Sequence, residues 1–414
     1  MSTPRLTDAL RPGLRVFVPT LSNESALLHS ELQADPARAS GVTFTGVQFP
    51  GIDRTDYLAL HPKARQSAFF MSRAVREGMA QGRAELLSLD YIGIARHLRD
   101  SAPPDVAIAQ LTPPDAEGWC SPGLTGDFLP LVWSRAGRRM AHINPRMPRT
   151  QGGFRVHISK IDVAVEAEAP LLEFAEPPAG DTEQRIGAHA AALVRDGDTL
   201  QFGIGSVPLA LGRALASHRQ LRFHGGLVSS ALRTLWEAGA LDRSAPVTTG
   251  VVLGDAAFHD FAAHLPKLAV RDVMHTHSLA VIAAIPRFVA INSAIEVDLF
   301  GQVNAERAGG VIQAGAGGLP AFAQGALASR GGRLLICLAA TARKGTVSRI
   351  VPVLTDQGLC TLPRHLADAV VTEHGVAELR GLSLDGRAEA LIAIAAPEHR
   401  DNLQAAWSAL RRTA

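Results

Sequence analysis

The chain has 414 residues, of which 47% are hydrophobic and 19% are charged, and its formal net charge is +2. This length exceeds what one hydrophobic core usually serves, so it favours two domains, and the composition is ordinary for a soluble α/β enzyme. The nearly balanced charge argues against a nucleic-acid-binding protein, which needs a strongly basic surface, and no apolar run reaches the roughly 18 residues of a membrane span.

The N-terminal stretch, MSTPRLTDALRPGLRVF, lacks the long apolar core of a signal peptide. We therefore expect a cytoplasmic protein with no membrane partner and no nucleic-acid partner. The three cysteines, Cys120, Cys337 and Cys360, are widely spaced and include no CxxC pair, which argues against a disulfide framework and a structural zinc site. We expect free thiols and no bound metal.

Two stretches of the chain repeat the same order of elements. Residues 13–32 contain a glycine, an apolar strand, a polar loop and a helix with leucines on one face, and residues 197–215 contain the same series. Further along, residues 42–49 match residues 221–228. Chance similarity between generic strand-helix units is the alternative. The repeat predicts an α/β protein with two open-sheet domains of related plan, each with a largely parallel sheet.

The best candidate for a linker is EFAEPPAGDTEQ (173–184), which combines proline, glycine and acidic residues. It predicts an N-terminal domain over 1–180 and a C-terminal domain over 181–414. The second domain continues with three glycine-rich and apolar blocks that we interpret as strands entering loops: 291–306, 331–354 and 368–381.

Two glycine loops have the composition of anion-binding loops. GIGSVP, with Gly203 and Gly205, follows the predicted strand TLQF and precedes a helix, so its backbone N–H groups and the helix N-terminus suit a phosphate or a thioester oxygen. A tight turn without a ligand is the alternative. The second loop, QAGAGG, contains Gly315, Gly317 and Gly318.

Glu373 follows directly after an apolar strand, where α/β enzymes usually display functional groups. A solvated loop carboxylate is the alternative reading of this residue. His275 and His277 lack a spaced third ligand, so we interpret them as ordinary loop residues rather than metal ligands. A standard serine hydrolase is not indicated, because the sequence contains no GxSxG motif.

Several blocks in order along the chain resemble the acetyl-CoA hydrolase/transferase family, which includes 4-hydroxybutyrate and succinate:acetate CoA-transferases. The resemblance covers at least three quarters of the chain. Its main blocks are QLTPPDAEGWCSPG, NPRMPRTQGG, DGDTLQFGIGSVP, INSAIEVDLFGQVNAE, KGTVSRIVP, VVTEHGVAELRG and RAEALIAIAAPEHRDNL.

The resemblance implies two CoA-transferase-type α/β domains with the active site between them, in a homodimer or a higher assembly. It implies an acyl-CoA thioester and a small carboxylate, or water, as substrates, and no permanently bound cofactor. In transferases of this family a glutamate attacks the thioester and then takes the CoA as a glutamyl thioester.

By motif, the resemblance assigns four glycines to the CoA and oxyanion loops, and it assigns Asn292 and Glu373 to polar positions that line the site. The four glycines are Gly203, Gly205, Gly317 and Gly318.

The sequence departs from the family at the nucleophile. The block that carries the glutamate reads FHGGL here, with Gly226 in the place of the glutamate. Gly225 and Gly226 form a possible substrate loop that leaves room for the thioester, a larger acyl group or a water molecule. The block GGLPAFAQGA also lacks the acid and the base that the family carries at Ala321 and Gln324.

A carboxylate from elsewhere must then serve as nucleophile. Glu24 is our first candidate, because it lies on the loop that matches GIGSVP by internal repeat, and Glu296 is the second. A carboxylate that stabilises a helix N-terminus is the alternative role for Glu24. Three readings follow: a CoA-transferase, a hydrolase with a carboxylate as general base, and a catalytically inactive CoA-binding subunit or sensor.

Overall fold

The structure is a computed structural model that describes residues 4–354 and 359–412. The chain forms two compact units, and it enters each of them more than once. Unit 1 comprises Met1–Ala175, Val247–Thr276 and Gln313–Gly315. Unit 2 comprises Glu176–Pro246, His277–Ile312 and Ala316–Ala414. The assignment of two domains that meet at residue 180 remains a prediction.

Unit 1 is built on a parallel sheet with the strand order β4-β3-β2-β1-β5-β7-β9. The chain steps outward from β1 to β4 on one side, and it continues on the other side from β5 to β9. Central β5 is buried at every position, as expected for a parallel strand covered on both faces. The strands are β1 (Arg15–Phe17), β2 (Thr43–Thr45), β3 (Arg65–Ala68), β4 (Ala84–Leu86), β5 (Val106–Leu111), β7 (Arg138–Ile143) and β9 (Val163–Glu166).

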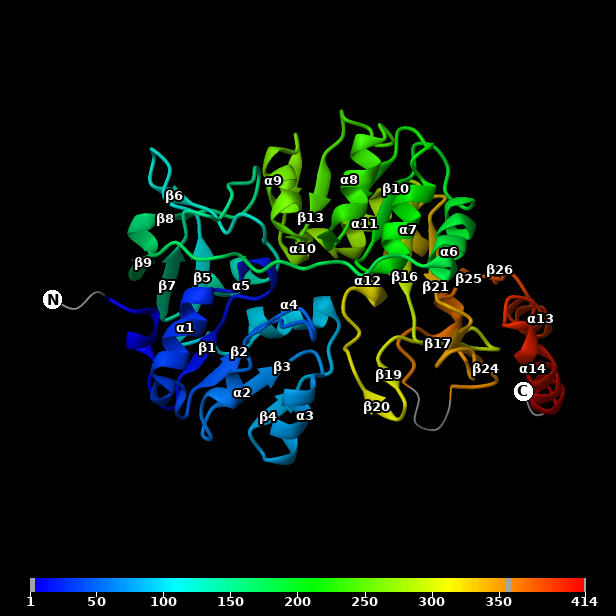
Figure 1. Cartoon of the computed structure of the whole chain (residues 1–414), viewed down its shortest axis with the longest axis horizontal. Coiled ribbons are helices and arrows are strands. Elements are labelled where there is room, and N and C mark those ends of the chain that lie inside the picture. The colour runs from blue at the N-terminus through cyan, green and yellow to red at the C-terminus, as the bar shows by residue number, and fades with distance from the viewer. Residues whose placement is uncertain (1–3, 355–358, 413–414) are drawn as a thin grey trace. The chain divides into compact units, whose positions relative to one another are not determined.

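Helices connect these strands, as the repeated strand-helix pattern predicts (Figure 1). Several begin at a serine or aspartate whose side chain accepts a backbone N–H of the first turn, for example Ser25, Ser72 and Asp90. The helices of unit 1 are α1 (Ala26–Ala34), α2 (Tyr57–Leu60), α3 (Arg73–Ala80), α4 (Tyr91–Asp100), α5 (Leu129–Trp133), α9 (Ala256–His264) and α10 (Val273–Thr276).

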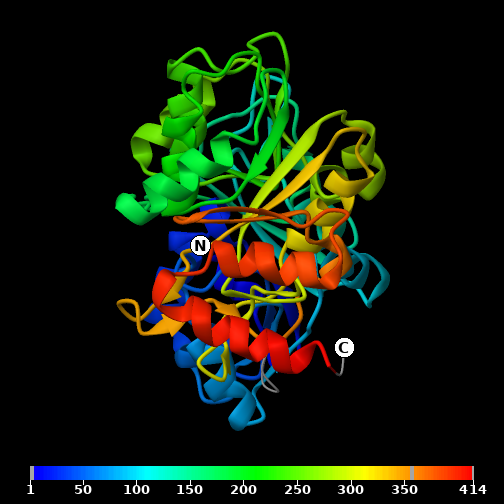
Figure 2. The ribbon, with the colours of Figure 1, turned by 90° about the vertical axis from the view of Figure 1, so that its right-hand side faces the viewer.

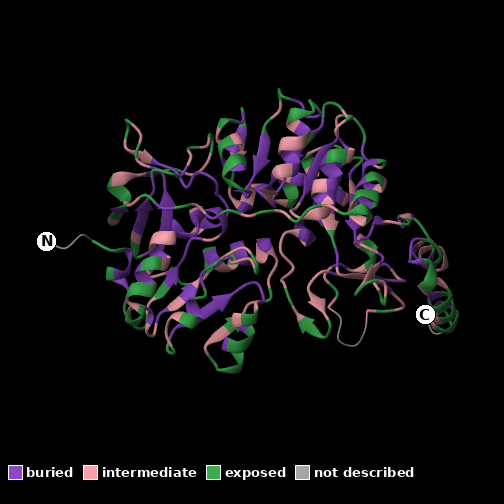
Figure 3. Cartoon of the chain, in the orientation of Figure 1, coloured by how far each residue is buried: buried purple, intermediate pink, exposed green. Residues whose placement is uncertain are grey.

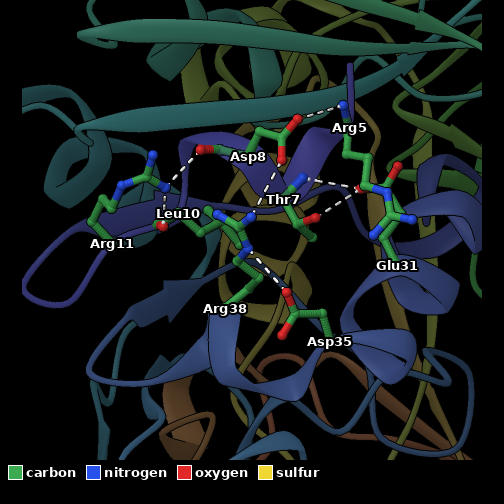
Figure 4. Close-up of polar contacts among 8 residues, drawn as sticks. All are labelled: Arg5, Thr7, Asp8, Leu10, Arg11, Glu31, Asp35 and Arg38. Carbon is green, nitrogen blue, oxygen red and sulfur yellow. Dashed lines mark hydrogen bonds and ion pairs between the residues drawn. The ribbon is translucent and has the colours of Figure 1, made fainter. Parts of the chain in front are cut away.

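The N-terminal segment of unit 1 is anchored by a buried glutamate (Figure 4). Glu31 of α1 is 9% exposed, and it accepts hydrogen bonds from the backbone N–H and the hydroxyl of Thr7, at 3.0 and 3.1 Å. Arg38 pairs with Asp35 and Asp8 nearby. These bonds hold the short 3-10 helix η1 (Leu6–Ala9) against the apolar core of the unit.

The main sheet of unit 2 runs in the order β11-β10-β16-β21-β25-β26. The pairs between β11 and β25 are parallel, and β26 closes the edge as an antiparallel hairpin with β25. Figure 3 shows the strands of this sheet as mostly buried. They are β10 (Thr199–Phe202), β11 (Arg222–His224), β16 (Phe288–Ser293), β21 (Arg333–Cys337), β25 (Ala369–Thr372) and β26 (Gly375–Glu378).

The helices of unit 2 are α6 (Asp181–Ala191), α7 (Ser206–Ala214), α8 (Ser230–Glu237), α11 (Leu279–Ala284), α12 (Leu319–Ala328), α13 (Leu384–Ala393) and α14 (Pro397–Leu410). Figure 2 shows the last two, in red, beside the β25–β26 hairpin. Trp407 of α14 is 3% exposed and donates its indole N–H to Asp385 of α13. The C-terminal helices therefore share the core of unit 2.

The block INSAIEVD does not form one continuous strand. β16 ends at Ser293, and a separate strand, β17 (Glu296–Asp298), pairs with β18 (Val303–Asn304) and β24 (Ile350–Val351). The change of partner occurs between Ala294, whose N–H bonds to Cys337, and Ile295, whose N–H bonds to Asn304. Asn292 and Glu296, the second candidate nucleophile, therefore lie on different strands.

Candidate functional site

The loop between β10 and α7 leaves its backbone open. A Cβ placed at Gly203 or at Gly205 would meet no atom within 4 Å, and Gly205 has a φ of +109°, which an L-residue adopts only with strain. Gly205 is also the N-cap of α7, so the partial positive charge of the helix N-terminus lies here. The open space beside Gly203 admits the close approach of a ligand, whereas the N–H of Gly205 at the helix N-terminus donates to the carboxylate of Glu176.

Two neighbouring cavities lie at the carboxyl ends of the parallel strands of unit 2. The smaller measures about 180 Å³. Its lining includes Gly203, Ile204, Pro208 and Asn292. The larger measures about 570 Å³. Its lining includes Asp181, Ser206, Ala339, Arg349 and Glu373. Val207, Ser293 and Cys337 line both cavities, which therefore share one wall.

Asn292 is held by its neighbour on the sheet. Its amide Nδ2 donates to Oε1 of Gln201 at 2.8 Å, and the Gln201 amide donates back at 3.4 Å. β10 and β16 pair in parallel with these two residues near their carboxyl ends. Gln201 is 3% exposed, so the pair satisfies a buried amide and fixes the orientation of Asn292 at the cavity wall.

Glu373 lies in the turn between β25 and β26 and lines the larger cavity. Its side chain is 8% exposed, its Oε2 accepts the backbone N–H of Ala340 at 2.8 Å, and its Oε1 lies 3.8 Å from Nε2 of His374. The structure thus brings three of the predicted site residues, Gly203, Asn292 and Glu373, to one pair of cavities. A carboxylate and an uncrowded glycine at one edge of a sheet can support acyl transfer.

Cys337, on the shared wall, is not a plausible nucleophile in this environment. The residue is 1% exposed, and burial raises the pKa of its thiol to about 12. The reactive thiolate is therefore scarce near neutral pH.

Glu176 is a candidate residue of the site that the sequence alone does not indicate. One of its carboxylate oxygens accepts the N–H of Gly205 at 3.2 Å and the hydroxyl of Ser229 at 3.0 Å, and the other accepts the N–H and the hydroxyl of Ser230. The carboxylate thereby links the GIGSVP loop to the start of α8. Its place in a proline-rich, acidic stretch indicates only a linker, because its partners lie 29 to 54 positions away in the chain.

The remaining glycines that the sequence assigns to the site lie away from these two cavities' linings, beside buried aromatic rings or in a turn. Gly226 and Gly318 both face the imidazole of His277, which is 1% exposed. Gly225 is buried and faces the ring of Phe223. Burial, and then repulsion from His224, lower the pKa of His277 to about 3, so this imidazole is neutral at physiological pH. Gly317 has a φ of +58°, as a tight turn requires.

Glu24 belongs to unit 1, and backbone groups of one loop occupy its carboxylate. It is 7% exposed and accepts the N–H of Thr55 at 2.8 Å and the N–H of Arg54 at 3.0 and 3.2 Å. Asp53 lies beside it and accepts the N–H of Leu21. Burial is the main cause that raises the pKa of Asp53 to about 7, with repulsion from Glu24 a further cause. These bonds fit a role for Glu24, the first candidate nucleophile, in anchoring this loop.

Within the part of the chain that the structure describes, no cluster of three or more His, Cys, Asp or Glu side chains could hold a metal ion. None of the helices in residues 4–354 and 359–412 is long and apolar enough to cross a membrane.

Comparisons with known proteins cover most of the chain. The family model of the acetyl-CoA hydrolase/transferase N-terminal domain matches residues 18–173, and that of the C-terminal domain matches residues 254–407. The 4-hydroxybutyrate coenzyme A transferase of Clostridium kluyveri is 36% identical over 346 residues, which are 82% of this chain and 81% of the relative.

Solved structures agree with these matches. RipA from Yersinia pestis superposes with a TM-score of 0.90 at 26% identity, over 99% of this chain and 97% of that chain. A 4-hydroxybutyrate CoA-transferase from Porphyromonas gingivalis superposes with a TM-score of 0.80 at 30% identity, over 99% and 96%. The predicted resemblance and the α/β fold are confirmed, and the chain belongs to the acetyl-CoA hydrolase/transferase family.

Proposed function

We propose that this protein is an enzyme that cleaves acyl-CoA thioesters and passes the CoA to a second carboxylic acid, or the acyl group to water. The observation that carries the proposal is the placement of Glu373 in a cavity of about 570 Å³, which shares a wall with the cavity lined by Gly203 and Asn292. Family membership supports the same class of substrate.

In this proposal the Glu373 carboxylate attacks the thioester carbonyl carbon, the C–S bond breaks, and CoA leaves as a thiolate. The thiolate then attacks the glutamyl carbonyl of the resulting anhydride and releases the first acid as a carboxylate. A second carboxylate reverses both steps and takes the CoA, whereas water hydrolyses the intermediate. The amide of Gly203 stabilises the oxyanion or binds a CoA phosphate, whereas the N–H of Gly205 donates to the carboxylate of Glu176.

We place Glu373 ahead of Glu24 and Glu296 as the nucleophile. Backbone N–H groups occupy both oxygens of Glu24, whereas Oε2 of Glu373 accepts the N–H of Ala340 and its Oε1 lies 3.8 Å from Nε2 of His374. Glu296 accepts the side-chain amide of Asn304 at 2.9 Å, and the strand break at residue 294 separates it from Asn292. Both remain candidates that one mapping experiment distinguishes.

The test is intact-mass spectrometry after incubation with acetyl-, butyryl- and succinyl-CoA, with borohydride trapping and peptide mapping. The Glu373→Gln variant is expected to lose both the adduct and the release of free CoA. Glu378→Gln is the matched control, because Glu378 lies in the same hairpin with a side chain that is 60% exposed. A Glu373→Gln variant that behaves like this control would remove Glu373 from the mechanism, and the mapped peptide would then identify the nucleophile.

A catalytically inactive CoA-binding protein is the second candidate, and Gly226 in the place of the usual nucleophile favours it. Its signature is acyl-CoA binding without an adduct and without free CoA, with an affinity that Glu24→Ala and Glu373→Gln leave unchanged. Isothermal titration beside a thiol-release assay separates this reading from either enzyme.

A further inference from the structure

The imidazole of His277 lies between the two glycine loops that contain Gly226 and Gly318. His277 follows α10 directly, and its ring packs against Phe322 of α12 with ring centroids 4.5 Å apart. The ring is 1% exposed, and Phe322 is 3% exposed. The imidazole is therefore part of a close-packed interior, where a neighbouring group cannot grow without displacing it.

The ring occupies the volume that a side chain at either glycine would need. A Cβ at residue 226 would lie 2.7 Å from Cε1 and 2.9 Å from Nε2 of His277, and a Cβ at residue 318 would lie 2.5 Å from Nε2. Carbon atoms in contact normally stay about 3.5–4.0 Å apart. Gly203 is a contrasting position in the same unit, since a Cβ there would meet nothing within 4 Å.

Gly226 does not need to be glycine for its backbone conformation. Its φ is not positive, whereas Gly205 and Gly317 have φ values of +109° and +58°. The steric demand of His277 is thus the physical reason that the structure offers for a glycine at 226.

We propose that the imidazole of His277 fills the space that an acidic side chain at residue 226 would need. A larger residue at 226 is then tolerated only when the residue at 277 is made smaller. The inference rests on the proposed function in one respect, because it assigns the attack on the thioester to a carboxylate away from residue 226. A glutamate returned to 226 then needs the ring at 277 removed before it reaches the substrate.

A double-mutant cycle on thermal unfolding tests the coupling without any need for turnover. Gly226→Ala is expected to lower the Tm by about 2–12 °C, the range that overpacking of an interior produces in a cooperative unit of about 150–250 residues, the size class of unit 2. In the His277→Ala background the same change is expected to cost much less, because the ring is gone. Gly203→Ala is the matched control, with a shift close to zero in both backgrounds.

A second experiment places a glutamate at residue 226 and measures the CoA adduct there. Gly226→Glu alone is expected to be destabilised and to form no CoA adduct on the peptide that contains residue 226, whereas Gly226→Glu with His277→Gly is expected to form one. Equal Tm shifts for Gly226→Ala in both backgrounds, or Gly226→Glu alone with the parental Tm and an adduct at 226, would overturn the proposal. A failure of Glu373 as nucleophile leaves both readouts unchanged, so the two proposals fail separately.

Discussion

Replacing Asp127 with asparagine is expected to stabilise the protein near neutral pH. The Asp127 side chain is 4% exposed, and its Oδ1 has no hydrogen-bond partner among the described residues. Burial, and then repulsion from Asp272, raise its pKa from 3.8 to about 8. Both residues belong to unit 1, where the Asp127 carbonyl accepts the N–H of Val273 at 3.0 Å.

The size of the expected stabilisation follows from the difference in the pKa of Asp127 between the folded and the unfolded chain. At pH 7 the folded protein keeps Asp127 protonated, whereas the unfolded chain has lost this proton above pH 3.8. Each pH unit of that interval is worth about 1.4 kcal/mol, so the cost at pH 7 reaches about 4 kcal/mol as an upper limit. A neutral amide of the same shape removes this cost.

The direction of the pKa shift of Asp127 determines how its effect on stability depends on pH. Because the folded pKa is raised, the contribution of Asp127 to stability is complete below pH 3.8, falls as the pH rises, and reaches its minimum above about pH 8. The gain from Asp127→Asn should therefore be absent near pH 4 and largest near pH 8. Urea unfolding at these pH values and at pH 7 measures it.

Asp162→Asn is the control with the opposite sign, because the hydrogen bond from Arg139 lowers the pKa of the Asp162 carboxyl. That substitution should cost a little stability at pH 7 and nothing well below the ordinary pKa of an aspartate. A gain from Asp127→Asn that is equal at all three pH values, or a loss at pH 7, would refute a buried neutral carboxyl at this position.

Three further substitutions or treatments test the site and its supports. Gly205→Ala should raise the KM for acyl-CoA, because a residue at φ +109° strains the loop that carries Gly203 and disturbs the hydrogen bond to Glu176, and an unchanged KM would exclude this loop from CoA binding. Glu24→Gln should lower the free energy of unfolding by about 1–3 kcal/mol in urea titrations while turnover persists, since the amide leaves a backbone N–H without its charged acceptor, and loss of turnover at unchanged stability would instead favour Glu24 as the nucleophile. Iodoacetamide at pH 8 should modify exposed Cys360 and leave Cys337, with its pKa of about 12, unmodified in peptide maps, and rapid labelling of Cys337 would contradict its burial.

Local sequence determined the elements and the family of this protein. The series of glycine, apolar strand, polar loop and helix predicts β10 and α7 with the open loop at Gly203 and Gly205 between them, and the structure has these elements. Such patterns are readable because a strand, its turn and its helix depend on residues within a few positions of one another. Glu373 at the end of β25 follows from the same rule.

Long-range packing decided which distant residues contact one another and where β16 ends. The partners of Glu176 at Gly205 and Ser230, and the ring of His277 against Gly226, join residues 29 or more positions apart, and no local preference specifies such contacts. The end of β16 at Ser293 depends on which neighbouring strand each N–H finds, not on the apolar alternation of the block. The sequence by itself thus determined which strands, loops and chemical groups exist, whereas the tertiary structure decided which side chain fills the space beside Gly226, because steric exclusion depends on atoms that the fold alone brings together.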